Sequence, residues 1–201
     1  AQQLMQAFAL AEKYPKDGYG EQAVALIKKY TAEELYKPDS ENLGRNVLHY
    51  AIISNDTENA IALINKTGVT AQQLFQQDTF GFTPLHKAIE KGNNKVALAL
   101  INKAGVTADH LFKQDKYGFT PLHRAIERKS NIISLALIGS DGVTIEQLLR
   151  KNKFGETAID VAEKNHIKDV AAAIEMRIKE LFPESTPRKS PTRQTQHQLH
   201  R

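Results

Sequence analysis

The chain has 201 residues, no cysteine and a formal net charge of +4. The absence of cysteine excludes disulfides, thiolate metal sites and cysteine nucleophiles. The longest apolar run, Val96 to Ile101, is far shorter than the ~20 residues of a membrane-spanning helix. Residues 183–201 hold a net +3, so the first 182 residues are nearly neutral and lack the basic surface typical of nucleic-acid binding.

Residues 1–41 are predicted to form two helices. Apolar residues at helical spacing predict one from Gln2 to Tyr14, which Pro15 ends, and a second from Glu21 to Tyr30. The pair Leu26-Ile27 recurs at intervals of 37 residues, as Leu63-Ile64, Leu100-Ile101 and Leu137-Ile138. We therefore interpret residues 1–41 as a degenerate first unit that caps a stack of repeats.

A six-residue motif recurs four times at the same interval of 37 residues, with copies that begin at Gly44, Gly81, Gly118 and Gly155. Glycine suits a turn with positive φ, and the Asn or Thr two residues later suits a helix N-cap. In the two middle copies proline follows at the first helical position, where its missing N–H costs nothing. Each unit is too small to bury a core alone, so neighbouring units must stack.

A second motif lies between the predicted helix pairs. Its copies are Thr31–Tyr36, Thr70–Phe75, Thr107–Phe112 and Thr144–Leu149. Threonine at the first position predicts the N-cap of a short helical turn. We expect the leucine and the large apolar residue at its end to be buried under the next helix pair.

The last unit differs from the others at positions where another repeat would pack. Glu163 and Glu175 replace isoleucines of the preceding units, which indicates a cap, and the final helix is predicted to run to Phe182. The following residues are rich in proline and polar side chains, which predicts disorder. The predicted organisation is a capping repeat at 1–41, repeats at 42–78, 79–115 and 116–152, a capping repeat at 153–182 and a disordered basic tail at 183–201.

The stretch from Asp78 to Ile101, with Thr83-Pro84-Leu85-His86 near its start, resembles the ankyrin repeat, and Asp115 to Ile138 repeats the pattern. The units are longer than the usual unit of about 33 residues because of the Thr-x-x-x-Leu-Phe insert. The resemblance implies an all-α ankyrin-repeat solenoid of stacked helix-turn-helix pairs with hairpin fingers. It also implies a concave surface of finger tips and first-helix faces that binds other proteins.

The histidines His49, His86 and His123 form a ladder with one residue per unit. Neighbouring units stack about 10 Å apart, which is too far for shared metal ligation. The resemblance implies that these side chains bond to the backbone of neighbouring turns, and we expect a structural role.

The predicted fingers carry two columns of residues in register. The first contains Leu43, Phe80, Tyr117 and Phe154, and the second contains Arg45, Phe82, Phe119 and Glu156. Alternation along an extended backbone predicts that one column faces solvent and the other faces inward. The resemblance places both columns and the first-helix charges at partner-facing positions. The predicted partner-binding residues are Phe80, Phe82, Tyr117, Phe119, Phe154, Glu90, Lys91, Glu127 and Arg128.

Each of these predictions has a simpler alternative. One aromatic column can fold back over Phe75 and Phe112, and mixed charges on a helix are usually only a solvated face. The nucleophile-elbow, P-loop and His-Glu-x-x-His patterns are absent from the sequence. We therefore expect no enzyme activity, catalytic residue, cofactor or metal.

The leading hypothesis is a monomeric, cytoplasmic protein–protein interaction module that recruits a protein partner, with no small-molecule substrate, nucleic acid or membrane. One alternative is the targeting part of a larger enzyme or of a secreted bacterial-type effector delivered into a host cell cytosol. Another is a nucleic-acid or membrane adaptor that acts through the basic tail.

Overall fold

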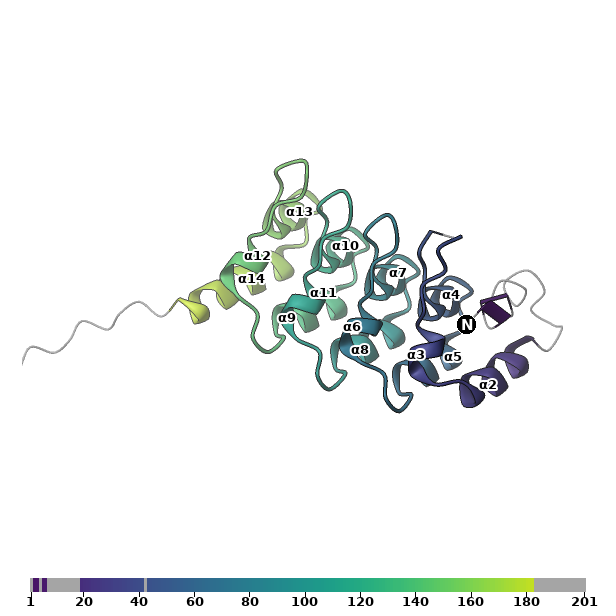
Figure 1. The fold of residues 1–201 in the computed structure, drawn as a ribbon. Coiled ribbons are helices and arrows are strands. Elements are labelled where there is room, and N and C mark those ends of the chain that lie inside the picture. Colours follow the sequence, from purple (N-terminus) through teal and green to yellow (C-terminus); the bar gives the residue numbers. More distant parts are fainter. Residues whose placement is uncertain (1, 4, 7–18, 42, 183–201) are drawn as a thin grey trace, which may run out of the picture.

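The structure is a computed structural model that describes residues 2–3, 5–6, 19–41 and 43–182. The helices stack side by side in a row from the N-terminal to the C-terminal end (Figure 1). Within the described ranges there is no strand, and the only bridge of β type joins Asp39 and Arg45. The predicted all-α repeat solenoid is therefore confirmed.

Four antiparallel helix pairs form the body of the stack. They are α4 (Val47–Ile53) with α5 (Thr57–Ile64), α7 (Pro84–Glu90) with α8 (Asn94–Ile101), α10 (Pro121–Glu127) with α11 (Asn131–Ile138), and α13 (Ala158–Lys164) with α14 (Lys168–Leu181). First helices pack on neighbouring first helices and second helices on second helices, while α2 (Tyr19–Lys29) packs against α5. No described helix has the length and apolar character needed to cross a membrane.

The first helices begin where the sequence predicts. Asn46, Thr83, Thr120 and Thr157 are N-caps with an extended backbone, and each forms a capping box with the residue three positions later. Pro84 and Pro121 follow at the first helical position. The alanines of the first-helix column, such as Ala88 and Ala125, are fully buried, so their small side chains permit close packing of the helices.

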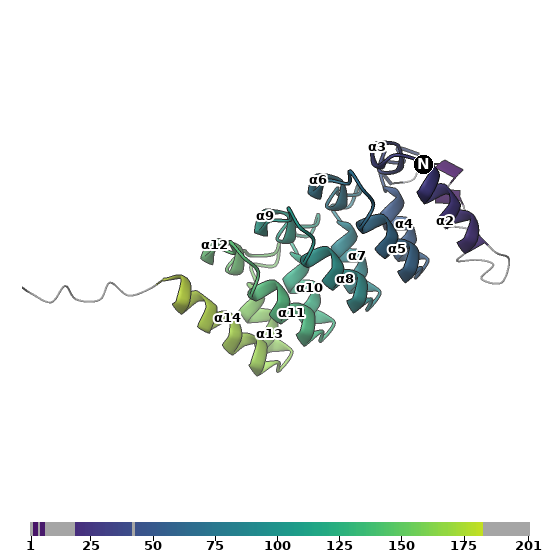
Figure 2. The same cartoon turned by 90° about the horizontal axis from the view of Figure 1, so that it is seen from below.

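The inserted motif forms a second row of short helices along one edge of the stack (Figure 2). These are α3 (Ala32–Leu35), α6 (Ala71–Leu74), α9 (Ala108–Leu111) and α12 (Ile145–Leu148). Phe75 and Phe112 are fully buried, as expected, whereas Leu149 at the same position of α12 is 40% exposed. The difference follows from position in the stack, because no further short helix lies over α12 in the described chain.

The C-terminal end has the features predicted for a cap. Glu163 and Glu175 are exposed, and α14 is longer than α5, α8 and α11. The predicted helix from Gln2 to Tyr14 falls mostly outside the described residues, and the predicted tail at 183–201 falls entirely outside them. The division of the chain into numbered units stays a prediction.

Candidate protein-binding surface

Each finger is a short loop that an acidic or amide side chain holds closed. Asp115 Oδ1 accepts hydrogen bonds from Tyr117 N at 2.8 Å and Phe119 N at 3.0 Å, while Asp115 N donates to Phe119 O at 2.9 Å. Asp78 makes the same contacts in the preceding finger, and Asn152 makes them in the last one. The requirement is therefore for a side-chain oxygen acceptor at the Oδ1 position, which Asp and Asn both supply.

Backbone hydrogen bonds join each finger to the next. Lys116 N donates to Phe80 O and Lys153 N donates to Tyr117 O, both at 2.9 Å. At Gly118 the backbone has φ of +79°, and a Cβ atom would lie 2.9 Å from Lys153 N. Glycine is therefore required at this position both by the conformation and by the close approach of the next finger.

The two columns on the fingers differ in exposure. In the outer column (Leu43, Phe80, Tyr117 and Phe154), Tyr117 is 44% and Phe154 72% exposed, and Phe80 is half-buried. In the inner column (Arg45, Phe82, Phe119 and Glu156), Phe119 is only 6% exposed and Phe82 is half-buried. This is the alternation that the sequence predicts, with the first column turned towards solvent.

The inner aromatic rings pack against first-helix side chains. The ring of Phe119 lies edge-on to His123 with centroids 5.9 Å apart, and the Arg124 guanidinium lies 4.1 Å from its centroid. Phe154 covers Phe119 with centroids 6.0 Å apart. Phe119 is consequently unavailable to a partner in this structure, whereas Phe82 keeps part of its ring accessible beneath Lys87.

The histidine ladder joins each first helix to the following finger. Nδ1 of His86 accepts from Thr83 N at 3.2 Å, so the ring proton resides on Nε2 and donates to Phe119 O at 3.1 Å. His49 and His123 bond in the same way to Phe82 O and Glu156 O. Burial lowers the pKa of His86 to about 4 and that of His49 to about 4, which keeps both rings neutral at pH 7. The predicted structural role is confirmed.

The first-helix charges form a rim beside the fingers. Glu90, Lys91, Glu127 and Arg128 are exposed. Lys87 Nζ lies 2.9 Å from Glu90 Oε2, and Arg124 Nη1 lies 3.1 Å from Glu127 Oε2. A cavity of about 110 Å³ opens here between α7 and α10, and Phe82 and Arg128 contribute to its lining.

Sequence reasoning missed Arg124, which joins the finger to the first-helix rim. Its guanidinium lies 2.6 Å from Asp115 Oδ2 and also covers Phe119 and pairs with Glu127. The available signal was its spacing of three residues from Glu127, which places both on one helix face.

Lys116 is a second residue that the sequence did not single out. Its Nζ atom lies 3.9 Å from the centroid of Phe80 and 4.9 Å from that of Tyr117, so an exposed cation joins two members of the outer column. Lys151 and Lys153 are exposed on the next finger. The outer column therefore combines aromatic rings with positive charge.

A family model for ankyrin repeats, in three copies, matches residues 16–110 and 70–145. The chain belongs to the ankyrin-repeat family. A search of curated proteins gives no match. Ankyrin repeats are generally protein–protein interaction modules and are typically not catalytic.

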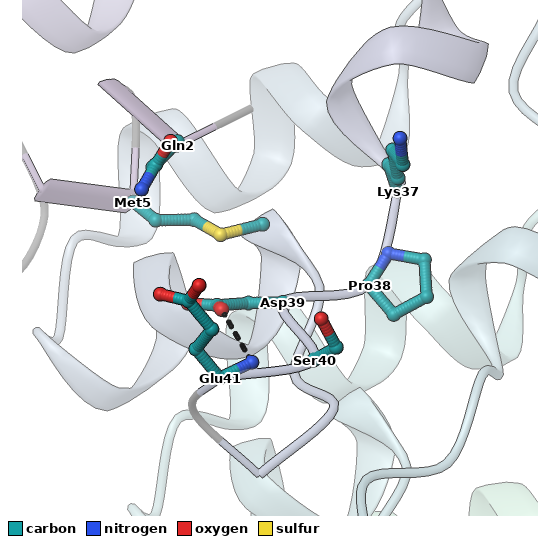
Figure 3. Close-up of a pocket in the computed structure, with 7 residues that line it drawn as sticks. All are labelled: Gln2, Met5, Lys37, Pro38, Asp39, Ser40 and Glu41. Atoms are coloured by element: carbon teal, nitrogen blue, oxygen red, sulfur yellow. Dashed lines mark hydrogen bonds between the residues drawn. The ribbon is translucent and has the colours of Figure 1, made fainter.

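The N-terminal finger of this ankyrin stack borders a pocket of about 220 Å³, which Figure 3 shows between Gln2 and Met5 on one side and the segment from Lys37 to Glu41 on the other. Asp39 Oδ1 accepts from Glu41 N at 3.2 Å, and Asp39 Oδ2 accepts from the Tyr50 hydroxyl at 3.1 Å. Burial and the hydrogen bond to Asp39 raise the pKa of Tyr50 to about 12. The Asp39 carboxylate thus holds the finger of this repeat in place.

The ankyrin stack also carries no metal-ligand cluster in the part of the chain that the structure describes. The buried carboxylates of its fingers accept backbone hydrogen bonds, and the buried histidines donate to backbone carbonyls. These buried titratable side chains therefore have structural partners.

Proposed function

We propose that this ankyrin stack recruits a protein partner through the outer column and the first-helix rim. The observation that carries the proposal is the exposure of Tyr117 and Phe154 on fingers that side-chain and backbone hydrogen bonds hold rigid. Large aromatic rings on a rigid support lose little conformational entropy on binding, which suits them as interface anchors.

The shape of this surface favours a protein over a small molecule. The outer column runs along several consecutive fingers, and the cavity beside it measures only about 110 Å³. A ligand that contacts Leu43, Phe80, Tyr117 and Phe154 together must be extended along the stack. A protein segment meets that requirement, whereas small-molecule sites usually enclose 300 Å³ or more, as a rough lower bound.

The rim residues complete the proposed interface. Glu90, Lys91, Glu127 and Arg128 flank the columns and supply polar contacts that discriminate between partners. Phe82 contributes its accessible edge, while Phe119 supports the fingers from below and is left out of the proposed contact set.

We further propose that the protein is a monomer. Its repeats lie at 42–78, 79–115 and 116–152, between capping units at 1–41 and 153–182. The exposed Glu163 and Glu175 support an end to the stack at the last helix pair, because burying either carboxylate under another repeat would cost several kcal/mol, as an order of magnitude. We place its action in the cytoplasm of the cell that makes it or, for an effector, in a host cytosol.

Crosslinking from the fingers, followed by identification and purification of the partner, tests this proposal. We expect the double variant Tyr117→Ala/Phe154→Ala to weaken the measured Kd at least tenfold, as a rough threshold. The matched control is Ile132→Ala/Leu135→Ala, which removes two similarly exposed apolar side chains from α11. Equal weakening by both double variants, or retention of binding by the finger variant, would contradict the proposal.

A further inference from the structure

A second cavity lies away from the fingers, between two successive repeats. It measures about 420 Å³ and lies between the loop after α8 and the C-terminal end of α11. In Figure 1 the loops that follow α8 and α11 lie at the edge of the stack opposite the fingers. Val106, Leu111 and Ala136 form apolar parts of its wall, and Asn102 and Asp141 are among its polar residues.

The corresponding boundaries between earlier units carry a lysine that reaches back across them. At the equivalent loop positions the chain reads Asn65-Lys66-Thr67, then Asn102-Lys103-Ala104, then Gly139-Ser140-Asp141. Lys66 Nζ donates to Ile27 O at 2.7 Å, and Lys103 Nζ donates to Asn65 Oδ1 at 3.5 Å. In both cases an ammonium group of one unit binds an oxygen of the preceding unit.

The third boundary lacks this lysine. Ser140 stands in its place and donates its hydroxyl hydrogen to Ala136 O of its own helix at 2.8 Å. Gly139 stands where the earlier units have asparagine, so a second side chain is missing from the same loop. The shorter side chains of Gly139 and Ser140 leave room in the cavity. Asn102, the counterpart of the acceptor Asn65, still lines it.

The same loop adds a negative charge that the earlier units lack. Asp141 replaces Thr67 and Ala104 at the equivalent position, and it is exposed at the cavity. No cation of the described chain forms a salt bridge with Asp141. Lys103 also lines the cavity, but its ammonium group is directed to Asn65 of the unit before.

We propose that this cavity binds a lysine side chain of a partner protein. The methylene chain lies along Val106, Leu111 and Ala136, where it buries apolar area. The ammonium group donates to Asn102 Oδ1, as Lys103 does to Asn65, and pairs with the Asp141 carboxylate. A side chain from another molecule thus takes the place that Lys66 and Lys103 occupy in the earlier units. This site is separate from the fingers and does not rest on the function proposed for them.

Titration of the 15N-labelled protein with Nα-acetyl-lysine N-methylamide, followed by NMR, tests the site. We expect saturable shifts of the amides of Asn102, Gly139 and Asp141. The norleucine analogue, which lacks the ammonium group, should bind about tenfold more weakly. Equal binding of both probes, or no saturable shift at these amides, would overturn the proposal. Much tighter binding of free 1,5-diaminopentane would also overturn it, because the ligand would then be a small diamine and not a lysine side chain of a protein.

Two variants separate the proposed site from non-specific binding. Ser140→Lys restores the lysine of the earlier units, and we expect it to fold normally and to abolish the shifts. Asp141→Ala copies Ala104, and we expect it to weaken binding several-fold while leaving the melting temperature unchanged. Phe154→Ala is the control that must bind the probe as the parent does. Undiminished binding by either loop variant would contradict the assignment.

Discussion

The outer and inner columns of the fingers differ in exposure although both carry aromatic residues. Tyr117 and Phe119 are two positions apart on one finger, and Asp115 Oδ1 accepts a hydrogen bond from the amide of each. Tyr117 is nevertheless 44% exposed, whereas Phe119 is 6% exposed under Phe154 and Arg124. Aromatic residues on one loop can therefore either face solvent or support the loop, according to the direction of the side chain.

The two columns also make different backbone hydrogen bonds. The inner residues Phe82 and Phe119 offer their backbone carbonyls to His49 and His86, which ties each finger to the preceding first helix. The outer residues Phe80 and Tyr117 offer their carbonyls to the next finger. One column thus joins the fingers to the helices, and the other joins the fingers to each other.

The largest expected effect on stability comes from disturbing the backbone conformation at Gly118, which lies between the outer-column and inner-column residues of its finger. We expect Gly118→Ala to lower the free energy of unfolding by about 3 kcal/mol or more, because it combines a positive φ with a backbone clash. Gly155→Ala is the matched control, since its φ is +80° but its Cβ would meet nothing within 4 Å. Urea denaturation should give a loss of about 1 kcal/mol for this control. Equal losses would show that the approach of the next finger is unimportant.

The next effect tests the supporting role of the inner column. We expect Phe119→Ala to cost about 3 kcal/mol, because it removes a buried ring that packs against His123, Arg124 and Phe154. Thermal unfolding monitored by circular dichroism measures this loss. If Phe119→Ala cost no more than Phe154→Ala, the distinction between the two columns would fail.

Acid tests the bonds between the histidines and the inner column. The pKa of His86 is about 4 in the folded chain and about 6.5 in the unfolded chain, so only the unfolded state binds the proton between these values. The contribution of neutral His86 to the free energy of unfolding is therefore fully present above pH 6.5. It falls as the pH drops towards 4, by up to about 1.4 kcal/mol per pH unit.

The His86→Gln variant isolates this contribution. Free energies of unfolding from urea titrations at several pH values should fall less steeply between pH 6.5 and 4 in the variant than in the parent, which still has His86. Parallel pH profiles for the two proteins would rule out His86 as a source of the dependence.

The smallest effect on stability is expected in the outer column. Phe154→Ala removes a ring that is 72% exposed, so we expect a change below about 1 kcal/mol from its contact with Phe119. The same variant should weaken partner binding clearly. A loss of several kcal/mol in stability would place Phe154 in the structural part of the finger instead.

The sequence by itself determined the 37-residue repeat, the N-caps of the helices and the membership of the ankyrin-repeat family. These features depend on local requirements that recur at fixed spacing, such as a threonine before proline at a helix start, and local chemistry is readable without tertiary contacts. The insert could also be predicted as a short capped helix, because its threonine and the residue three positions later form a capping box within one turn.

The direction of each aromatic side chain was decided by the tertiary structure alone. Alternation predicted that the columns face opposite ways, but the choice between them depends on contacts of the folded chain. Arg124 covers Phe119 from the first helix of the same unit, and Phe154 of the next finger meets Phe119 only after the units stack. The exposure of Leu149 and the open groove beside Ser140 are likewise set by what the neighbouring unit does or does not place there. Burial is a property of assembled neighbours, whereas a cap or a turn is a property of a few consecutive residues.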